Sequence, residues 1–345
     1  MNERVERLRA SLEEPLLVTT GANVRYLSGF ESTNAALLVE PGRVALYTDF
    51  RYAEAARAVE GAELVETRRS LFVHLAELLS GTIAFEPDGV SFAQYQTLAT
   101  GGLELVPRPG AVEALRAVKD EEELAAIRAA AEITDRVYER LADERFTGRT
   151  ERDLSHRIEQ LFWEHGAEQL AFPVIVASGP NAAQPHAHSG GREIELRETV
   201  IVDAGCTMGG YCSDCTRTFA TGPLPEDLHE AYAVCLQGQE AGLAAVAPGK
   251  TGIEVDAAAR EVIAAAGLDE AFGHGLGHGV GLLVHEAPRL APESKDTLAA
   301  GNVVTVEPGV YLPGSGGIRI EDLVVIRDGG PEVLSRVTKN LITVS

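Results

Sequence analysis

Residues 201–219, IVDAGCTMGGYCSDCTRTF, constrain the fold more than any other stretch of the chain. An apolar run delivers Asp203, a small-residue stretch with Gly209-Gly210 turns the chain, and a β-branched and aromatic run carrying Asp214 follows. This pattern predicts a β-hairpin. In a hairpin the numbers of two facing residues always add to the same total. A turn centred between Met208 and Gly209 therefore places Asp203 opposite Asp214, on one face.

Two facing carboxylates repel each other at neutral pH. Either one of them takes up a proton, or a positive group such as a divalent metal lies between them. Two Asp near a turn are more often turn or cap residues than ligands. The metal hypothesis therefore depends on the rest of the chain.

Residues 302–330 predict a second hairpin with the same arrangement of acids. The run at 303–306 leads into Glu307, a Pro- and Gly-rich stretch turns the chain, and the returning strand carries Glu321. A centre near Gly314 places Glu307 opposite Glu321. Arg319 precedes Glu321 by two positions, so it lies on the same face of the strand and can hold a carboxylate through a bidentate pair.

Residues 272–288, FGHGLGHGVGLLVHEAP, carry three histidines, His274, His278 and His285. The repeated Gly excludes a stable helix and, with it, a zinc site built on a helical HExxH motif. In a regular strand His274 and His278 share a face, whereas His285 does not.

Four carboxylates and a histidine form an oxygen-rich donor set with one nitrogen. Two divalent ions balance the charge of the four carboxylates and leave a bridging hydroxide as the extra anion, which is the arrangement of a two-metal hydrolase. Hard oxygen donors favour Mn²⁺, with Co²⁺ and Zn²⁺ as alternatives.

Composition narrows the class of protein. The chain has 345 residues and a formal net charge of −22, which disfavours a nucleic-acid or anionic-membrane partner. No apolar run approaches the roughly 18 residues of a membrane helix. Four Cys and the absence of a signal-like start predict a cytoplasmic protein. Cys212 and Cys215 form a CxxC without a second pair, so a structural-zinc or redox role is disfavoured.

Alternating strands and helices predict an α/β N-terminal domain at residues 1–112, followed by a catalytic domain at 113–345. In the first, residues 1–15 predict a short helix ended by Pro15. The stretches 15–30, 34–40 and 42–52 predict strands. In the second, a long helix begins at Lys119-Asp120 with acids in its first turn, and another spans Glu151–His165. Residues 228–244 and 253–266 predict two further helices.

At this point the chain resembles the pita-bread metallopeptidases, and within them the Xaa-Pro branch of aminopeptidase P and prolidase. NVRYLSGF and TDFRY resemble the creatinase-type first domain, and 113–345 resemble the catalytic domain. The motifs VDAG, SDCTRTF, GHGVG, VEPG and RIED occur in the family's order. The resemblance implies that the metal ligands are Asp203, Asp214, His278, Glu307 and Glu321.

The resemblance also implies roles in hydrolysis of the bond before proline. Glu307 is expected to take a proton from the attacking water and pass it to the leaving nitrogen. His274 and His285 are expected to contact the scissile carbonyl, and His186 to line the substrate site. A homodimer and a proline-containing peptide substrate follow from the resemblance alone.

Three alternatives remain open at this stage. A creatinase-like metal-free hydrolase and a non-catalytic peptide-binding module on the same fold are disfavoured because all five ligands are present. A methionine aminopeptidase is disfavoured by the additional N-terminal domain.

Arg51 is either a folding residue or, if the first domain overhangs the cleft, a partner for a substrate carboxylate. That second reading slightly favours a dipeptidase over an aminopeptidase.

Overall fold

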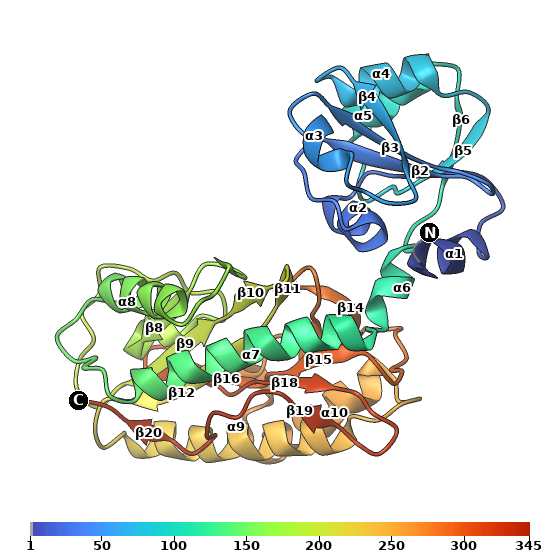
Figure 1. The fold of residues 1–345 in the computed structure, drawn as a ribbon. Helices are drawn as coiled ribbons and strands as arrows, with labels where there is room; N and C mark the ends of the chain where they lie inside the picture. Colours follow the sequence, from blue (N-terminus) through green and yellow to red (C-terminus); the bar gives the residue numbers. More distant parts are fainter. Residues whose placement is uncertain (1–2) are drawn as a thin grey trace. The chain divides into compact units, whose positions relative to one another are not determined.

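The computed structural model describes residues 3–345 and divides the chain into two compact units, Met1–Arg116 and Ala117–Ser345. The predicted order of an α/β first domain and a mixed catalytic domain is confirmed (Figure 1). Among the described residues, no helix combines the length and apolar character needed to cross a bilayer.

The first unit is built on a six-stranded mixed sheet in the order β4-β3-β2-β1-β5-β6. Its strands are β1 (Leu16–Val18), β2 (Ala35–Val39), β3 (Val44–Asp49), β4 (Glu63–Thr67), β5 (Thr82–Phe85) and β6 (Glu104–Pro107). Its helices are α1 (Glu3–Arg9), α2 (Gly21–Ser28), α3 (Ala53–Ala56), α4 (Leu71–Leu78) and α5 (Phe92–Thr100), with α6 (Glu113–Ala117) at the boundary. Leucines of α4 and α5 pack on one face of the sheet.

Two predictions for this unit are wrong. Residues Gly21–Ser28 form helix α2 rather than part of a strand, because Val24 and Leu27 are buried at helical spacing and Gly29 ends the helix with φ of 70°. Helix α1 ends at Arg9, well before Pro15.

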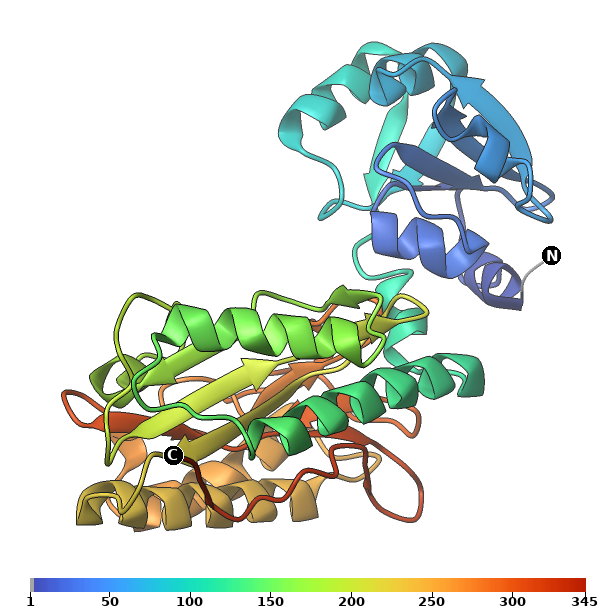
Figure 2. The same cartoon turned by 60° about the vertical axis from the view of Figure 1, so that its left-hand side comes forward.

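The second unit places its strands between two pairs of helices (Figures 1 and 2). The helices are α7 (Glu121–Leu141), α8 (Glu151–Glu164), α9 (Glu226–Ala245) and α10 (Gly252–Ala265), with short 3₁₀ turns at Gly179–Ala183 and Asp269–Ala271. The strands are β7 (Gln169–Leu170), β8 (Ile175–Ser178), β9 (Thr199–Ala204), β10 (Cys206–Met208), β11 (Tyr211–Cys212), β12 (Cys215–Ala220), β13 (Gly277–Gly279), β14 (Glu286–Leu290), β15 (Val303–Val306), β16 (Gly309–Leu312), β17 (Gly316–Arg319), β18 (Asp322–Val325), β19 (Glu332–Val333) and β20 (Ile342–Thr343). All four predicted helices of this unit are confirmed.

Helix α7 begins where the sequence predicts it. The Asp120 side chain accepts a hydrogen bond from the amide of Glu123 at 2.9 Å, and the Glu123 side chain accepts one from the amide of Asp120 at 3.0 Å. This reciprocal capping box satisfies two amide groups that the first turn leaves without helical partners.

Two sheets carry or directly border the five expected metal ligands, in the orders β20-β12-β9-β8 and β14-β13-β15-β18-β19. Alternate side chains of these strands face opposite ways. Val200 and Val202 pack with α7 and α8, and Val304 and Val306 pack with α9 and α10. In the first sheet the intervening positions include Asp203, which lines a cavity. In the second sheet, intervening residues such as Val303 pack on α7, and Glu307 at the end of β15 lines the same cavity. We call the face of Val200, Val202, Val304 and Val306 the helix side, and the opposite face, where it carries these acids, the cavity side.

Candidate metal centre

The first acidic hairpin turns at Gly209 and Gly210, which have φ of 56° and 79°. Both values lie in the left-handed region that a tight two-residue turn requires and that glycine adopts without strain. The turn centre is therefore one residue later than predicted, and Asp203 pairs with Thr216 instead of Asp214. A shift of two positions in the pairing keeps both acids on the cavity side, as diagonal neighbours.

The second acidic hairpin has the predicted register. Val306 pairs with Asp322 and Gly309 pairs with Arg319, so both ladders align Glu307 with Glu321. The two acids themselves lie between these ladders. The amide of Glu307 donates to the carbonyl of Leu276 at 2.8 Å, and the amide of Glu321 donates to that of Thr216 at 3.1 Å. Each acid therefore connects its hairpin to another segment of the site.

His278 joins the four acids from the short strand β13. Its Nε2 lies 3.2 Å from Glu307 Oε1 and 3.6 Å from Asp214 Oδ2. The strand is glycine-rich because the neighbouring chains approach closely: a Cβ on Gly277 would lie 2.1 Å from the carbonyl oxygen of Thr305. Only Gly277–Gly279 is extended, so the condition under which His274 and His278 share a strand face is not met.

The donor atoms fit divalent cations. Ligand atoms of Asp214, His278 and Glu321 lie within 4.8 Å of one another. Two buried oxygens, Asp203 Oδ1 and Glu321 Oε1, have no hydrogen-bond partner within residues 3–345. A buried carboxylate oxygen without a partner is costly, and a cation between these carboxylates would satisfy both oxygens.

Burial and mutual repulsion act on the acids. Burial raises the pKa of Asp214 well above its usual value, and the nearby charges of Glu321 and Asp203 raise it further. Burial likewise raises the pKa of Glu321, with help from Glu307 and Asp203. Burial also opposes ionisation of Glu307, but the hydrogen bond and charge of His278 outweigh it and lower the pKa of Glu307 to about 2. The site is thus short of positive charge.

Arg319 is fully engaged with protein groups. Its Nη2 contacts Asp203 Oδ2 at 2.6 Å, its Nε donates to Thr216 Oγ1 at 3.2 Å, and its Nη1 donates to the Tyr311 hydroxyl at 3.0 Å and the Pro185 carbonyl at 3.2 Å. The carboxylate that it holds is therefore that of Asp203, through one nitrogen rather than two. A substrate carboxylate would have to compete with these partners.

A cavity of about 840 Å³ opens above the acids. It is lined by Asp203, Asp214, Glu307, Arg319 and the histidines His186, His188, His274, His278 and His285. The His285 ring packs edge-on against His278 with centroids 4.3 Å apart. The His274 ring lies 2.9 Å from the Tyr311 hydroxyl through Nε2 and 2.7 Å from the Gly275 carbonyl through Nδ1. Apolar groups such as Phe172 and Ile175 form another part of the wall.

Comparison with known proteins identifies this arrangement. Residues 125–328 match the model of metallopeptidase family M24, and residues 4–118 match that of the Creatinase/Prolidase N-terminal domain. The chain belongs to metallopeptidase family M24. It is 33% identical to a Xaa-Pro dipeptidase of Pyrococcus furiosus over 350 residues, covering 99% of this chain and 100% of the relative.

Two solved structures are closely similar to this one. A Xaa-Pro dipeptidase from Bacillus anthracis superposes with a TM-score of 0.95 at 36% identity, covering 99% of both chains. An X-Pro aminopeptidase from Thermotoga maritima superposes with a TM-score of 0.89 at 33% identity, covering 99% of this chain and 100% of that one. The predicted membership of the pita-bread family is confirmed.

Two arginines, one predicted and one not, are separate from the acidic cluster. Arg51 lies in the first unit, where its guanidinium forms a bidentate pair with Asp49 at 2.8 and 2.7 Å. Arg289 lines the cavity of the M24 unit and was not predicted. Its side chain is 61% exposed and contacts Glu293 at 3.1 Å. Only its position four residues after His285 could have signalled it.

Proposed function

We propose that this metallopeptidase holds two divalent ions and hydrolyses the bond before proline in dipeptides. The convergence of two acidic hairpins and His278 on one cavity carries the proposal. The ligands would be Asp203, Asp214, His278, Glu307 and Glu321. The oxygen-rich set favours Mn²⁺.

Bound ions would polarise the scissile carbonyl and lower the pKa of the attacking water. The protein side chains would move the protons. Glu307 is ionised at neutral pH because its pKa is lowered to about 2, so it can accept a proton from water and deliver it to the leaving nitrogen. Burial lowers the pKa of His285, and the charge of His278 lowers it further. The neutral His285 ring can therefore donate a hydrogen bond to the oxygen of the scissile carbonyl.

The preference for dipeptides depends on a cation that recognises the substrate carboxylate. Arg319 already has four protein contacts, whereas Arg289 lines the cavity and makes an exposed contact with Glu293. Exposed ion pairs contribute little, so Arg289 can exchange Glu293 for a substrate carboxylate at small cost. We propose Arg289 for this role, with Arg51 as the alternative that the sequence suggests.

The test compares a Xaa-Pro dipeptide with a Xaa-Pro-Yaa-Zaa tetrapeptide on the Mn²⁺-loaded protein. We expect two ions per chain and faster cleavage of the dipeptide. Arg289→Gln should raise KM for the dipeptide by about ten- to a hundredfold, the value of a charge-assisted hydrogen bond, and leave the tetrapeptide unaffected. Lys295→Gln is the matched control because Lys295 is an exposed cation nearby that does not line the cavity.

Other outcomes identify other functions. Equal cleavage of both peptides supports a Xaa-Pro aminopeptidase. An effect of Arg51→Gln without one of Arg289→Gln assigns the carboxylate to Arg51. Failure to bind metal and to cleave any proline peptide contradicts the proposal. The homodimer and the cytoplasmic location stay predictions, and light scattering and cell fractionation would test them.

A further inference from the structure

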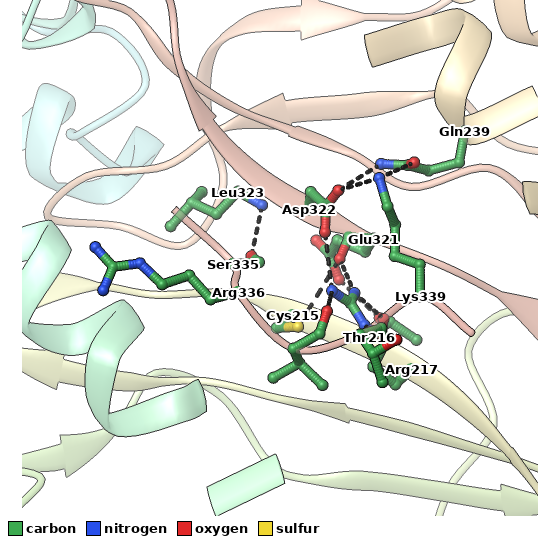
Figure 3. A network of polar contacts seen from close by, with 12 residues as sticks. Cys215, Thr216, Arg217, Gln239, Glu321, Asp322, Leu323, Ser335, Arg336 and Lys339 are labelled. Carbon is green, nitrogen blue, oxygen red and sulfur yellow. Dashed lines mark hydrogen bonds and ion pairs between the residues drawn. The ribbon is translucent and has the colours of Figure 1, made fainter. Parts of the chain in front are cut away.

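The helix side of the sheets carries a buried charged network directly behind the metal ligand Glu321 (Figure 3). Glu321 faces the cavity side, so its neighbour Asp322 projects to the helix side, where it pairs with Arg217 of β12. The two side chains are 1% and 2% exposed. None of the proposed catalytic steps uses them.

Arg217 binds the main chain around the ligand. Its Nη1 donates to the carbonyl of Glu321 and, at 3.0 Å, to the carbonyl of Thr216. Thr216 in turn donates through Oγ1 to Glu321 Oε2 at 2.7 Å. Arg217 therefore fixes the backbone of Glu321 and also the residue that holds the Glu321 carboxylate.

The remaining nitrogens of Arg217 reach the segment 335–339, which runs between α7 and α9 (Figure 1). We call it the seam segment. Nη2 donates to the carbonyl of Val337 at 2.7 Å, and Nε donates to that of Thr338 at 3.1 Å. From α7, the Asp135 carboxylate accepts the amides of Arg336 and Val337 at 2.9 and 3.3 Å. The seam segment is thus held in place from both sides.

Asp322 completes the network from the other end. Its Oδ1 contacts Arg217 Nη2 at 2.9 Å, and its Oδ2 accepts from Gln239 Nε2 and from Lys339 Nζ, both at 2.9 Å. Lys339 Nζ also donates to Gln239 Oε1 at 2.8 Å. Figure 3 shows Gln239 reaching Asp322 from its helix, with Lys339 beside it. Both oxygens of this buried carboxylate are therefore satisfied.

A buried ion pair by itself is weak support for stability, because well-packed apolar residues often serve as well. The arrangement here does something that apolar packing cannot do, since it binds a specific carbonyl of a ligand residue. Groups that orient metal ligands from outside the site commonly affect metal affinity.

We propose that Arg217, Asp322 and Lys339 are positioning residues that hold Glu321 in place for metal binding. The inference rests on the proposed two-metal site and extends it to the helix side of the sheets. The seam segment belongs to this network, because it supplies Lys339 and two of the carbonyls that fix the Arg217 guanidinium.

The test measures Mn²⁺ binding by calorimetry on the full chain and three variants. Arg217→Lys keeps the charge but replaces the planar fork by a single ammonium, which cannot reach Glu321 and the seam segment together. Asp322→Asn removes the central charge. Lys339→Met removes the outermost member, whose side chain is 25% exposed, and is the variant most certain to fold.

Arg192→Lys is the matched control. Arg192 forms an ion pair with Glu198 in the same unit, with side chains 28% and 13% exposed, and it contacts none of the proposed ligands. Urea unfolding of the metal-free proteins records what each substitution costs in stability. The visible spectrum of the Co²⁺ form reports ligand geometry independently of activity.

We expect Arg217→Lys and Asp322→Asn to weaken binding of at least one ion by about ten- to a hundredfold and to alter the Co²⁺ spectrum. Lys339→Met should have a smaller effect in the same direction, and Arg192→Lys should bind as the wild type does. Wild-type affinity and spectrum in all folded network variants overturn the inference, even if their stability falls. A wild-type protein that binds no metal overturns both this inference and the proposed function.

Discussion

Thr216 bonds both a carboxylate and a guanidinium of the site. Its hydroxyl donates to Glu321 Oε2 at 2.7 Å and accepts from Arg319 Nε at 3.2 Å. Because Arg319 also holds Asp203, one small side chain ties an acid of the first hairpin to an acid of the second. The hydroxyl is fully buried, so water cannot replace it.

Thr216→Val should therefore affect metal binding as well as stability. The change leaves a buried acceptor of Glu321 without its donor, at a cost of about 1–3 kcal/mol in the free energy of unfolding. Thr221→Val is the control: its buried hydroxyl bonds main-chain groups of Glu195 and Glu198, at 2.6 and 2.9 Å, and none of the proposed ligands. We expect both variants to lose stability in urea unfolding, and Thr216→Val alone to bind Mn²⁺ more weakly in calorimetry. Equal Mn²⁺ affinities would contradict the role of Thr216.

The raised pKa values of Asp214 and Glu321 predict proton release on metal binding. Burial, followed by neighbouring negative charge, favours the protonated acids in the metal-free protein, and a metal binds only the ionised form. Affinity for Mn²⁺ should therefore fall as the pH falls. Calorimetry in buffers of different ionisation enthalpy measures the released protons. Identical binding enthalpies in all buffers would show that both acids are already ionised.

At the residue scale, the sequence predicts which acids and histidines belong together but not what holds them. The acids are recognisable because each lies in or directly beside an apolar strand of a predicted hairpin. Thr216 and Arg289 are not, since their roles depend on which strands meet across the site. Arg319 was expected to hold a carboxylate, and only the folded chain shows that this carboxylate belongs to Asp203.

Among the elements, strand β13 packs closely against both of its neighbours. Gly277 faces the Thr305 carbonyl at a distance that leaves no room for a side chain, and Gly279 faces that of Ala287, where a Cβ would lie 2.3 Å away. His278 stands between these two glycines. The close approach of the neighbouring strands is what brings its ring to the acids.

Gly277→Ala should push β13 away from β15 and displace His278. We expect a loss of about 1–3 kcal/mol in the free energy of unfolding, as for other overpacked sites, together with weaker Mn²⁺ binding. Gly273→Ala in the same segment is the control, because its Cβ would have nothing within 4 Å and its cost should stay within about 0.5 kcal/mol. Urea unfolding and Mn²⁺ titration of both variants provide the measurement, and equal behaviour of the two would contradict this account.

Turn chemistry explains how far the elements could be predicted. Gly314 has φ of 82°, and the register of its hairpin was predicted correctly. In the first hairpin both Gly209 and Gly210 adopt positive φ, and the prediction placed the centre one residue too early. The acids stayed on one face because the register shifted by an even number of residues. Helix α2 was mistaken for a strand because its apolar residues are few and its helical burial depends on tertiary packing.

For the whole molecule, the two compact units have separate hydrophobic cores, and all five proposed ligands lie in the second. The chain's single tryptophan, Trp163, lies in α8 of the second unit and is 52% exposed. Tryptophan fluorescence therefore reports the unfolding of the unit that carries the site.

Mn²⁺ should stabilise the second unit by mass action. At a free concentration a hundredfold above Kd, the expected gain in the free energy of unfolding is about 2.7 kcal/mol per site, and chelation with EDTA should reverse it. The shift of the Trp163 fluorescence transition in urea measures this gain. K⁺ at the same ionic strength controls for nonspecific ionic effects. A transition that does not respond to Mn²⁺ would contradict a metal centre in this unit.

The wide spacing of the site along the chain has a consequence during synthesis. Translation proceeds at about 5–20 residues per second, so Asp203 leaves the ribosome seconds before Glu321 is made. No partial chain that lacks the second hairpin presents the full set of donors. Ions of the proposed centre would therefore meet their complete set of donors only after translation has passed both hairpins.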